Sequence, residues 1–118
     1  MFRMDRFYLE AIVTLSAYLE YMKLDPQETE LMGKWIVENG QTRADPICER
    51  IKWLTAHHLI KISISKQWGA WETLFQDPDD GRYWEQMYPQ SERHGGGPPT
   101  LKHLSREQAK AKYGSDIE

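Results

Sequence analysis

Two aromatic segments separated by a tight turn constrain the fold of this chain more than any other feature. WETLF (residues 71–75) and RYWEQMY (residues 82–88) have the composition of β-strands, and QDPDDG lies between them. The proline of this connection restricts φ, its aspartates can hydrogen-bond to nearby backbone, and its glycine tolerates a positive φ. Two strands joined in this way form a hairpin, so the sequence predicts an antiparallel sheet.

Three further segments have the features of strands. The WIV segment (residues 35–37) favours a strand, and a strong Asn-Gly turn signal follows at residues 39–40. IKISIS (residues 60–65) alternates isoleucine with polar residues, which predicts a half-buried strand. LKHL (residues 101–104) has the features of a short strand. The sheet therefore has candidates on both sides of the hairpin in sequence.

Helix signals appear in three places. Apolar residues recur at spacings of three and four over residues 3–23, which predicts an amphipathic helix that ends before the Asp-Pro pair that follows. At Asp45-Pro46, the aspartate suits an N-cap and the proline suits the first helical position, so a central helix begins there. Ser105 with Gln108 forms a capping box for a last helix, which Gly114 closes.

Together these elements predict an α+β fold. We expect a small antiparallel sheet of about four to five strands packed with an N-terminal, a central and a C-terminal helix. The length of 118 residues predicts one domain over residues 1–118. The wide apolar face of the helix over residues 3–23 is expected to pack on the chain's own sheet. A second copy of the chain and a partner protein are the alternatives for that face.

Charge and composition exclude several classes of protein. The net charge is −3, and Lys and Arg do not cluster as they do in proteins that bind nucleic acid. No apolar segment approaches the length of about 20 residues that spans a membrane, and the N-terminus lacks a signal-peptide core. Cys48 is the single cysteine, which excludes an internal disulfide and fits a reducing compartment. We expect a cytoplasmic protein whose acidic segments at residues 25–40 and 66–90 favour a basic partner.

Two segments look like ligand-binding loops, but one lacks the residue spacing of a calcium loop and the other lacks that of a phosphate-binding loop. An EF-hand calcium loop needs glycine at its sixth position and glutamate at its twelfth, whereas DPDDGRYWE (residues 77–85) has them at the fifth and ninth. HGGGPP (residues 94–99) has no P-loop lysine, and its prolines prevent the helix that follows a phosphate-binding loop. Its glycines instead allow the backbone to pass close to another element.

The histidines and the cysteine do not form a recognisable catalytic or metal-binding set. His57 and His58 are adjacent and point to different faces of a helix, so at most one of them could bind a shared ion. Zinc sites usually show C-x-x-C or H-x-x-x-H spacing, which this sequence lacks. Cys48 lies on the apolar side of its helix, where a thiol is usually inert. The sequence therefore predicts no metal, no cofactor and no catalytic residue.

Several short motifs occur in a fixed order along the chain: GKW, NGQ, CERIKWL, GAWETLF, DPDDGRYWE, YPQSE and HGGGPP. Together they resemble the immunity protein 27 family of bacterial polymorphic-toxin systems. The resemblance covers residues 29–114 and leaves the helix over residues 3–23 outside. It implies a non-enzymatic antidote inside the cell that binds and neutralises the toxin domain of a cognate effector.

The resemblance implies a toxin-binding surface, and acidic residues are the candidates for it. We predict that Glu72, Asp77, Asp79 and Asp80 lie on the docking rim and that inhibition is steric, because acidic complementarity speeds the capture of a basic partner. The motif residues are expected to be structural: Gly33, Trp35, Asp45, Arg50, Trp71, Gly81, Arg82, Trp84, Glu85, Gly95, Gly96 and Pro98.

Among these structural residues, Glu85 needs a partner. It alternates with Arg82 and Trp84, so it lies on the other face of its strand. A buried carboxylate is stable when paired with a basic group, and Arg50 is the candidate for that pair. Most of the tryptophans and tyrosines are expected in the core, with a minority exposed as anchors for a partner.

Two other function classes remain open at this point. One is a small metal-dependent hydrolase that uses Asp77, Asp80, Glu85 and a histidine. The other is an adaptor that forms a homodimer through the helix over residues 3–23. The sequence does not decide between a monomer and a homodimer.

Overall fold

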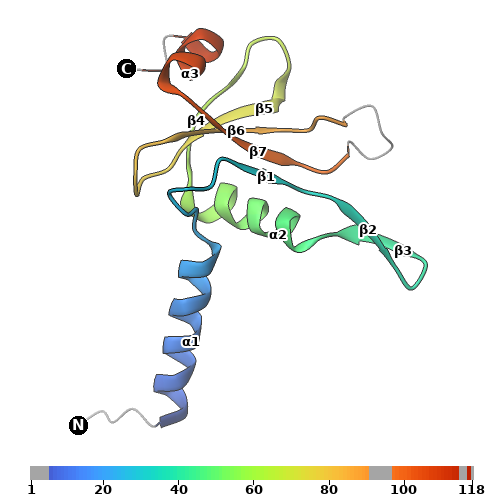
Figure 1. The fold of residues 1–118 in the computed structure, drawn as a ribbon, viewed down its shortest axis with the longest axis vertical. Coiled ribbons are helices and arrows are strands. Elements are labelled where there is room, and N and C mark those ends of the chain that lie inside the picture. The colour runs from blue at the N-terminus through green and yellow to red at the C-terminus, as the bar shows by residue number, and fades with distance from the viewer. Residues whose placement is uncertain (1–5, 91–96, 115–116, 118) are drawn as a thin grey trace.

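The computed structural model describes residues 6–90, 97–114 and 117, and it confirms the α+β architecture (Figure 1). The helices are α1 (Arg6–Met22), α2 (Pro46–Trp53), which a π-helical segment η1 (Leu54–His58) continues, and α3 (Arg106–Tyr113). The strands are β1 (Glu30–Met32), β2 (Trp35–Glu38), β3 (Gln41–Ala44), β4 (Ile60–Ser65), β5 (Gly69–Gln76), β6 (Tyr83–Met87) and β7 (Thr100–Leu104).

The strands form one five-stranded sheet and one separate pair. The order in the sheet is β1-β7-β6-β5-β4, and all neighbours are antiparallel. Strands β2 and β3 form the pair. Helices α2 and α3 lie on opposite sides of the sheet (Figure 1). Strand β6 is therefore central in two senses, because strands flank it and helices cover both of its faces.

The predicted hairpin between β5 and β6 is confirmed. The Asp77 backbone N–H donates to the Arg82 carbonyl at 2.9 Å, and the Gly81 N–H donates to the Asp77 carbonyl at 2.8 Å. The Asp77 side chain accepts from the Asp79 backbone N–H at 2.8 Å, which is an Asx turn. Gly81 has a φ of 78°, a conformation that costs glycine little.

The predicted strand at residues 35–37 is also confirmed. It is β2, and the turn at Asn39 and Gly40 returns the chain into β3 with φ angles of 54° and 76°. Two successive positive φ angles are the mark of a type I′ turn, which matches the twist of a hairpin. The sequence does not predict β3, because its residues QTRA are mostly polar.

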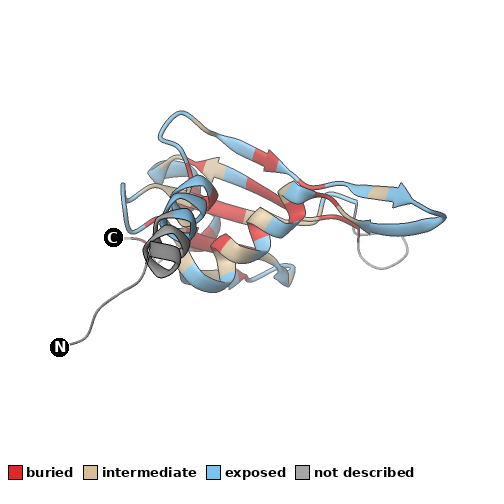
Figure 2. Cartoon of the chain, turned by 90° about the horizontal axis from the view of Figure 1, so that it is seen from below, coloured by how far each residue is buried: buried red, intermediate tan, exposed pale blue. Residues whose placement is uncertain are grey.

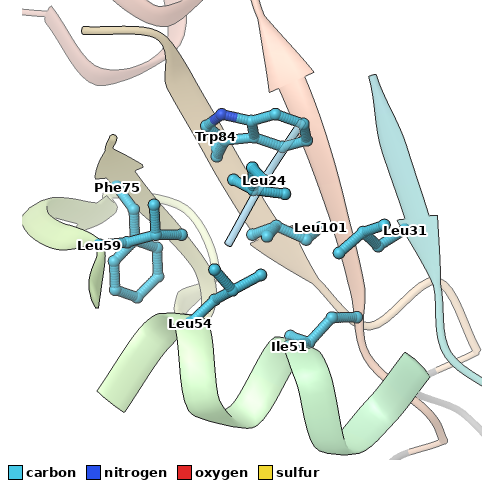
Figure 3. Close-up of a cluster of buried hydrophobic side chains, with 8 residues drawn as sticks. All are labelled: Leu24, Leu31, Ile51, Leu54, Leu59, Phe75, Trp84 and Leu101. Carbon is cyan, nitrogen blue, oxygen red and sulfur yellow. The ribbon is translucent and has the colours of Figure 1, made fainter. Parts of the chain in front are cut away.

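Helix α2 covers one face of the sheet with a compact apolar cluster. Asp45 is its N-cap, and its carboxylate accepts from the Cys48 backbone N–H at 2.8 Å, as predicted. Figure 3 shows Ile51 and Leu54 pointing from the helix toward the strands. The buried members of the cluster are Leu24, Leu31, Ile51, Leu54, Leu59, Phe75, Trp84 and Leu101.

Helix α3 covers the other face with a second, smaller cluster. Its predicted capping box is present, with both the Ser105 and the Gln108 side chains bonded to backbone, and Gly114 ends it with a φ of 67°. The buried members of this cluster are Leu74, Leu104, Ala109, Tyr113 and Ile117. Figure 2 shows buried residues along the strands of the sheet.

The sequence predicts that the isoleucines of the edge strand β4 share one half-buried face, and the structure differs. Ile62 is half-buried, but Ile60 and Ile64 are 52% and 44% exposed. Register shifts against β5 occur between Lys61 and Ser63 and again at Ser65. These irregularities interrupt the alternation of faces, because an extra residue reverses the side to which the following side chains point.

The expectation that the N-terminal helix packs on the sheet is wrong. Helix α1 projects away from the sheet and its covering helices (Figure 1). Leu15, Tyr18 and Tyr21 are 58%, 53% and 77% exposed, and burial begins at Met22. Helices α2 and α3 pack against the two faces of the sheet instead. Within the residues described, no helix is long and apolar enough to cross a membrane.

The two apolar surfaces should respond differently to the same substitution. Leu54→Ala should lower the free energy of unfolding by about 2–5 kcal/mol, because it leaves a cavity in the cluster under α2. Leu15→Ala should change it by less than about 0.5 kcal/mol, because this side chain is exposed. Urea denaturation followed by circular dichroism measures both. Equal losses would show that α1 packs on the sheet in solution.

Candidate functional site

Arg50, on α2, holds the segment that connects α1 to β1. Its Nε donates to the Met22 carbonyl at 3.0 Å, and a terminal nitrogen donates to the Lys23 carbonyl at 2.6 Å. Its two terminal nitrogens also bind the two Glu28 carboxylate oxygens at 2.7 and 2.6 Å, a bidentate pair. These hydrogen bonds hold the pKa of Glu28 below its ordinary value. Arg50 therefore fixes where α1 leaves the body of the protein.

Arg82 ties the β5–β6 turn to the same connecting segment. Its terminal nitrogens donate to the Glu28 carbonyl at 2.7 Å and to the Asp25 carbonyl at 3.0 Å. Its Nε binds the Asp80 carboxylate at 2.7 Å. The guanidinium carbon lies 4.9 Å from the centre of the Trp84 ring, within the range of a cation–π contact. These contacts hold Arg82 between the turn and the connecting segment.

The three aspartates of the turn differ in their surroundings. Asp77 is 1% exposed and lies 3.3 Å from His58 Nε2, whereas the Asp79 side chain is 55% exposed. Burial favours the neutral acid of Asp80, but hydrogen bonds from the Arg82 backbone and guanidinium outweigh it and lower the pKa of Asp80. Of the three, Asp79 is the carboxylate best placed to contact another molecule.

A cleft of 700 Å³ lies between the end of α1 and this turn. Carboxylates dominate it, but Lys23 and Arg50 also line it, and Lys23 Nζ lies 3.9 Å from Asp79. The acidic residues that line the cleft are Glu20, Asp25, Glu28, Asp79 and Asp80.

Glu72, the fourth predicted contact residue, lies apart from the aspartates. It stands near the start of β5, opposite Met87 of β6, whereas the turn joins the other ends of these strands. Its carboxylate binds Lys112 Nζ of α3 at 2.7 Å. The four residues therefore do not form one surface, because Glu72 lies apart from the turn and Asp77 is buried. Their role in toxin binding stays a prediction.

An aromatic groove of 440 Å³ lies beside Glu72. We define the groove by its lining residues, Trp68, Trp71, Glu72, Met87, Tyr88 and Pro89. Trp68 and Trp71 are 57% and 53% exposed, and Trp71 meets the Tyr88 ring edge-on with centroids 5.4 Å apart. The sequence identified these aromatic residues but did not show which of them the fold leaves exposed.

The predicted pairing of Glu85 with Arg50 is wrong, although Glu85 is buried as expected, at 2% exposure. Its carboxylate accepts from the Tyr113 hydroxyl at 2.6 Å and binds Lys112 Nζ at 2.7 Å. Burial and this hydrogen bond raise the pKa of Tyr113. Glu85 faces α3, on the side of the sheet away from Arg50, so the two side chains cannot meet.

The remaining motif residues have varied surroundings. A Cβ on Gly33 would lie 2.6 Å from both the Cys48 sulfur and the Pro99 carbonyl oxygen, so a close backbone approach requires glycine there. Pro98 is buried and Trp35 is 40% exposed. Gly95 and Gly96 lie outside the described residues.

The residues proposed for a hydrolase do not all come together. Asp80 is engaged by Arg82, and Glu85 lies with α3 on the opposite side of the sheet. Cys48 is buried, and burial raises the pKa of its thiol, which keeps it from acting as a thiolate nucleophile. Of the predicted set, the structure joins Asp77 to a histidine, His58, with Asp79 as a third member.

The sequence model of Immunity protein 27 matches residues 37–105, more than half of the chain. The chain belongs to the immunity protein 27 family. The match begins within β2 and ends just before α3, so it is narrower than the predicted span of residues 29–114. Comparison with curated proteins and with solved structures finds no match.

The boundaries of the family match separate the two candidate surfaces. The aromatic groove lies entirely within residues 37–105. The acidic cleft takes three of its five carboxylates from residues before the match, at Glu20, Asp25 and Glu28. Of these two surfaces, only the aromatic groove is formed entirely by residues that match the family model.

The partner of Glu85 can be tested with a double-mutant cycle. Glu85→Gln and Tyr113→Phe should each lower the free energy of unfolding by about 1–3 kcal/mol, because each leaves a buried polar group poorly paired. The double variant should show coupling of about 0.5–3 kcal/mol. For Glu85→Gln and Arg50→Gln, the two changes in the free energy of unfolding should simply add in the double variant. Urea denaturation measures both cycles. Coupling between Glu85→Gln and Arg50→Gln would instead support the predicted pair of Glu85 with Arg50.

The bond between Arg50 and Glu28 should appear in the pH dependence of stability. Because the pKa of Glu28 is lowered in the folded state, its charge stabilises the fold above the unfolded value of about 4.3. That contribution is lost as the pH falls through the folded pKa. Glu28→Gln should therefore be less stable than the parent chain at pH 7, with the difference shrinking below about pH 4.

The control for this measurement is Glu20→Gln, because Glu20 is an exposed carboxylate whose partner is Lys23. The stability of Glu20→Gln should differ from that of the parent chain by a small and nearly constant amount across the same pH range. Thermal melting at each pH provides both curves. A flat difference for Glu28→Gln would contradict the assigned role of Arg50.

Proposed function

We propose that this protein is a non-enzymatic, cytoplasmic immunity protein that binds and neutralises the toxin domain of a cognate effector. The observation that carries the proposal is the family match over residues 37–105. The separation of Asp80 and Glu85, described above, also speaks against the hydrolase alternative. Inhibition by binding needs only a complementary surface that covers the working surface of the toxin.

The aromatic groove is our candidate for the centre of that surface. Two neighbouring tryptophans that are more than half exposed leave apolar area in water, which a partner can cover favourably. Tryptophan and tyrosine are enriched among the residues that dominate binding energy at protein interfaces. The Glu72–Lys112 pair lies at the edge of the groove and offers a polar rim.

Asp79 and its neighbours are proposed to act mainly on the rate of encounter. The exposed carboxylates of the acidic cleft favour approach by a basic toxin surface, and such steering changes association more than dissociation. Desolvated aromatic side chains slow dissociation instead. An antidote needs both properties, because free toxin must be captured quickly and held.

A second candidate is a homodimeric adaptor joined through α1. It is favoured by the exposed side chains of Leu15, Tyr18 and Tyr21 on a helix that projects from the body. Leu15→Glu should convert a dimer into a monomer in sedimentation equilibrium. A parent chain that is monomeric at high concentration would remove this candidate.

The toxin-binding proposal can be tested by co-expression with a toxin domain, if the neighbouring reading frame encodes one. The two chains should purify as a complex, and the complex should lack toxicity. Trp71→Ala should weaken binding at least about tenfold in calorimetry, the effect expected for truncating an interface anchor. Trp35→Ala is the matched control, because Trp35 is a similarly exposed tryptophan outside the groove.

The possible outcomes test the toxin-binding function and the choice of binding surface separately. Absence of both complex and protection would overturn the proposed function. Equal effects of Trp71→Ala and Trp35→Ala would keep the function but remove the groove as its centre. A loss confined to Asp79→Asn would move the centre to the acidic cleft.

A further inference from the structure

Three potential metal ligands meet where η1 ends beside the β5–β6 turn. His58 Nε2 lies 3.3 Å from an Asp77 carboxylate oxygen and 3.4 Å from an Asp79 carboxylate oxygen. One ligand atom from each of the three residues lies within 4.8 Å of the others. The histidine and the aspartates are far apart in the sequence, so only the folded chain brings them together.

The imidazole of His58 is the unusual member of this cluster. Its side chain is 10% exposed, and its Nε2 atom is buried without a hydrogen-bond partner among the described residues. The ring stacks on Trp53, with centroids 5.9 Å apart and planes 13° apart, which fixes its orientation. A buried nitrogen that lies near two carboxylates, without hydrogen-bond geometry to either, is a position where one bound cation would contact all three groups.

The two separations from His58 Nε2 to the carboxylates suit a zinc ion. Zinc binds imidazole nitrogen and carboxylate oxygen at about 2.0–2.2 Å in tetrahedral geometry, so neighbouring ligand atoms stand about 3.3–3.5 Å apart. The two separations from His58 Nε2 are 3.3 and 3.4 Å. Asp77 is held in place as well, because its carboxylate accepts from the Asp79 backbone N–H at 2.8 Å. The exposed side of Asp79 leaves room for water to complete the coordination.

We propose that His58, Asp77 and Asp79 bind a zinc ion that joins the end of η1 to the β5–β6 turn. Lys23 is the nearest competitor, because its Nζ lies 3.9 Å from the Asp79 carboxylate. The inference does not rest on the proposed function. The cluster lies at the turn between β5 and β6, whereas the aromatic groove lies at the other ends of these strands.

The test is a titration of the full chain with zinc chloride after removal of metal by a chelator. Calorimetry should show one equivalent bound, and the melting temperature should rise with zinc concentration. His58→Asn should weaken binding at least tenfold, and Asp79→Asn should do the same. His57→Asn is the matched control, because this neighbouring histidine is exposed and outside the cluster, and it should bind zinc as the parent chain does.

A further variant tests the geometry without removing a ligand. Lys23→Gln should tighten zinc binding, because it removes the competing cation next to Asp79. X-ray absorption of the zinc complex should show nitrogen and oxygen ligands and no sulfur. No binding by the metal-free chain, or binding that His58→Asn leaves unchanged, would overturn the proposal, and neither result would affect the test of toxin binding.

Discussion

Two guanidinium groups organise this protein around one connecting segment. Arg50, on α2, and Arg82, at the β5–β6 turn, donate to backbone carbonyls between residues 22 and 28. Arg50 also binds the Glu28 carboxylate, and Arg82 also binds the Asp80 carboxylate. A planar group with several donors in a fixed arrangement can satisfy such a set at once, which lysine cannot do. The entry of the chain into the sheet and the departure of α1 both follow from these contacts.

The same contacts explain why acidic residues in this chain have two kinds of role. Asp77, Asp80 and Glu28 are held by internal partners, and their charges serve the fold. Asp79 remains largely exposed beside them. An acidic motif is therefore a weak guide to a binding surface, because a carboxylate that is needed to hold a turn looks the same in sequence as one that contacts a partner.

The two candidate binding regions lie at opposite ends of the β5–β6 hairpin. One end holds the turn, the His58 cluster and the acidic cleft, where polar groups bind each other or an ion. The other end holds the aromatic groove, where Trp68 and Trp71 expose apolar area that the fold does not use. Strands β5 and β6, which are covered on both faces, lie between these two surfaces.

The sequence by itself determined the β5–β6 hairpin, the turn at Asn39 and Gly40, and the caps at Asp45 and Ser105. It also indicated the family. Turn and cap geometry depends on residues a few positions apart, so a short segment contains all of the information. Only the tertiary structure decided the partner of Glu85, the exposure of α1 and the meeting of His58 with Asp77. These depend on which faces the helices cover and on which distant segments they bring together, and that choice is made by the packing of the whole chain.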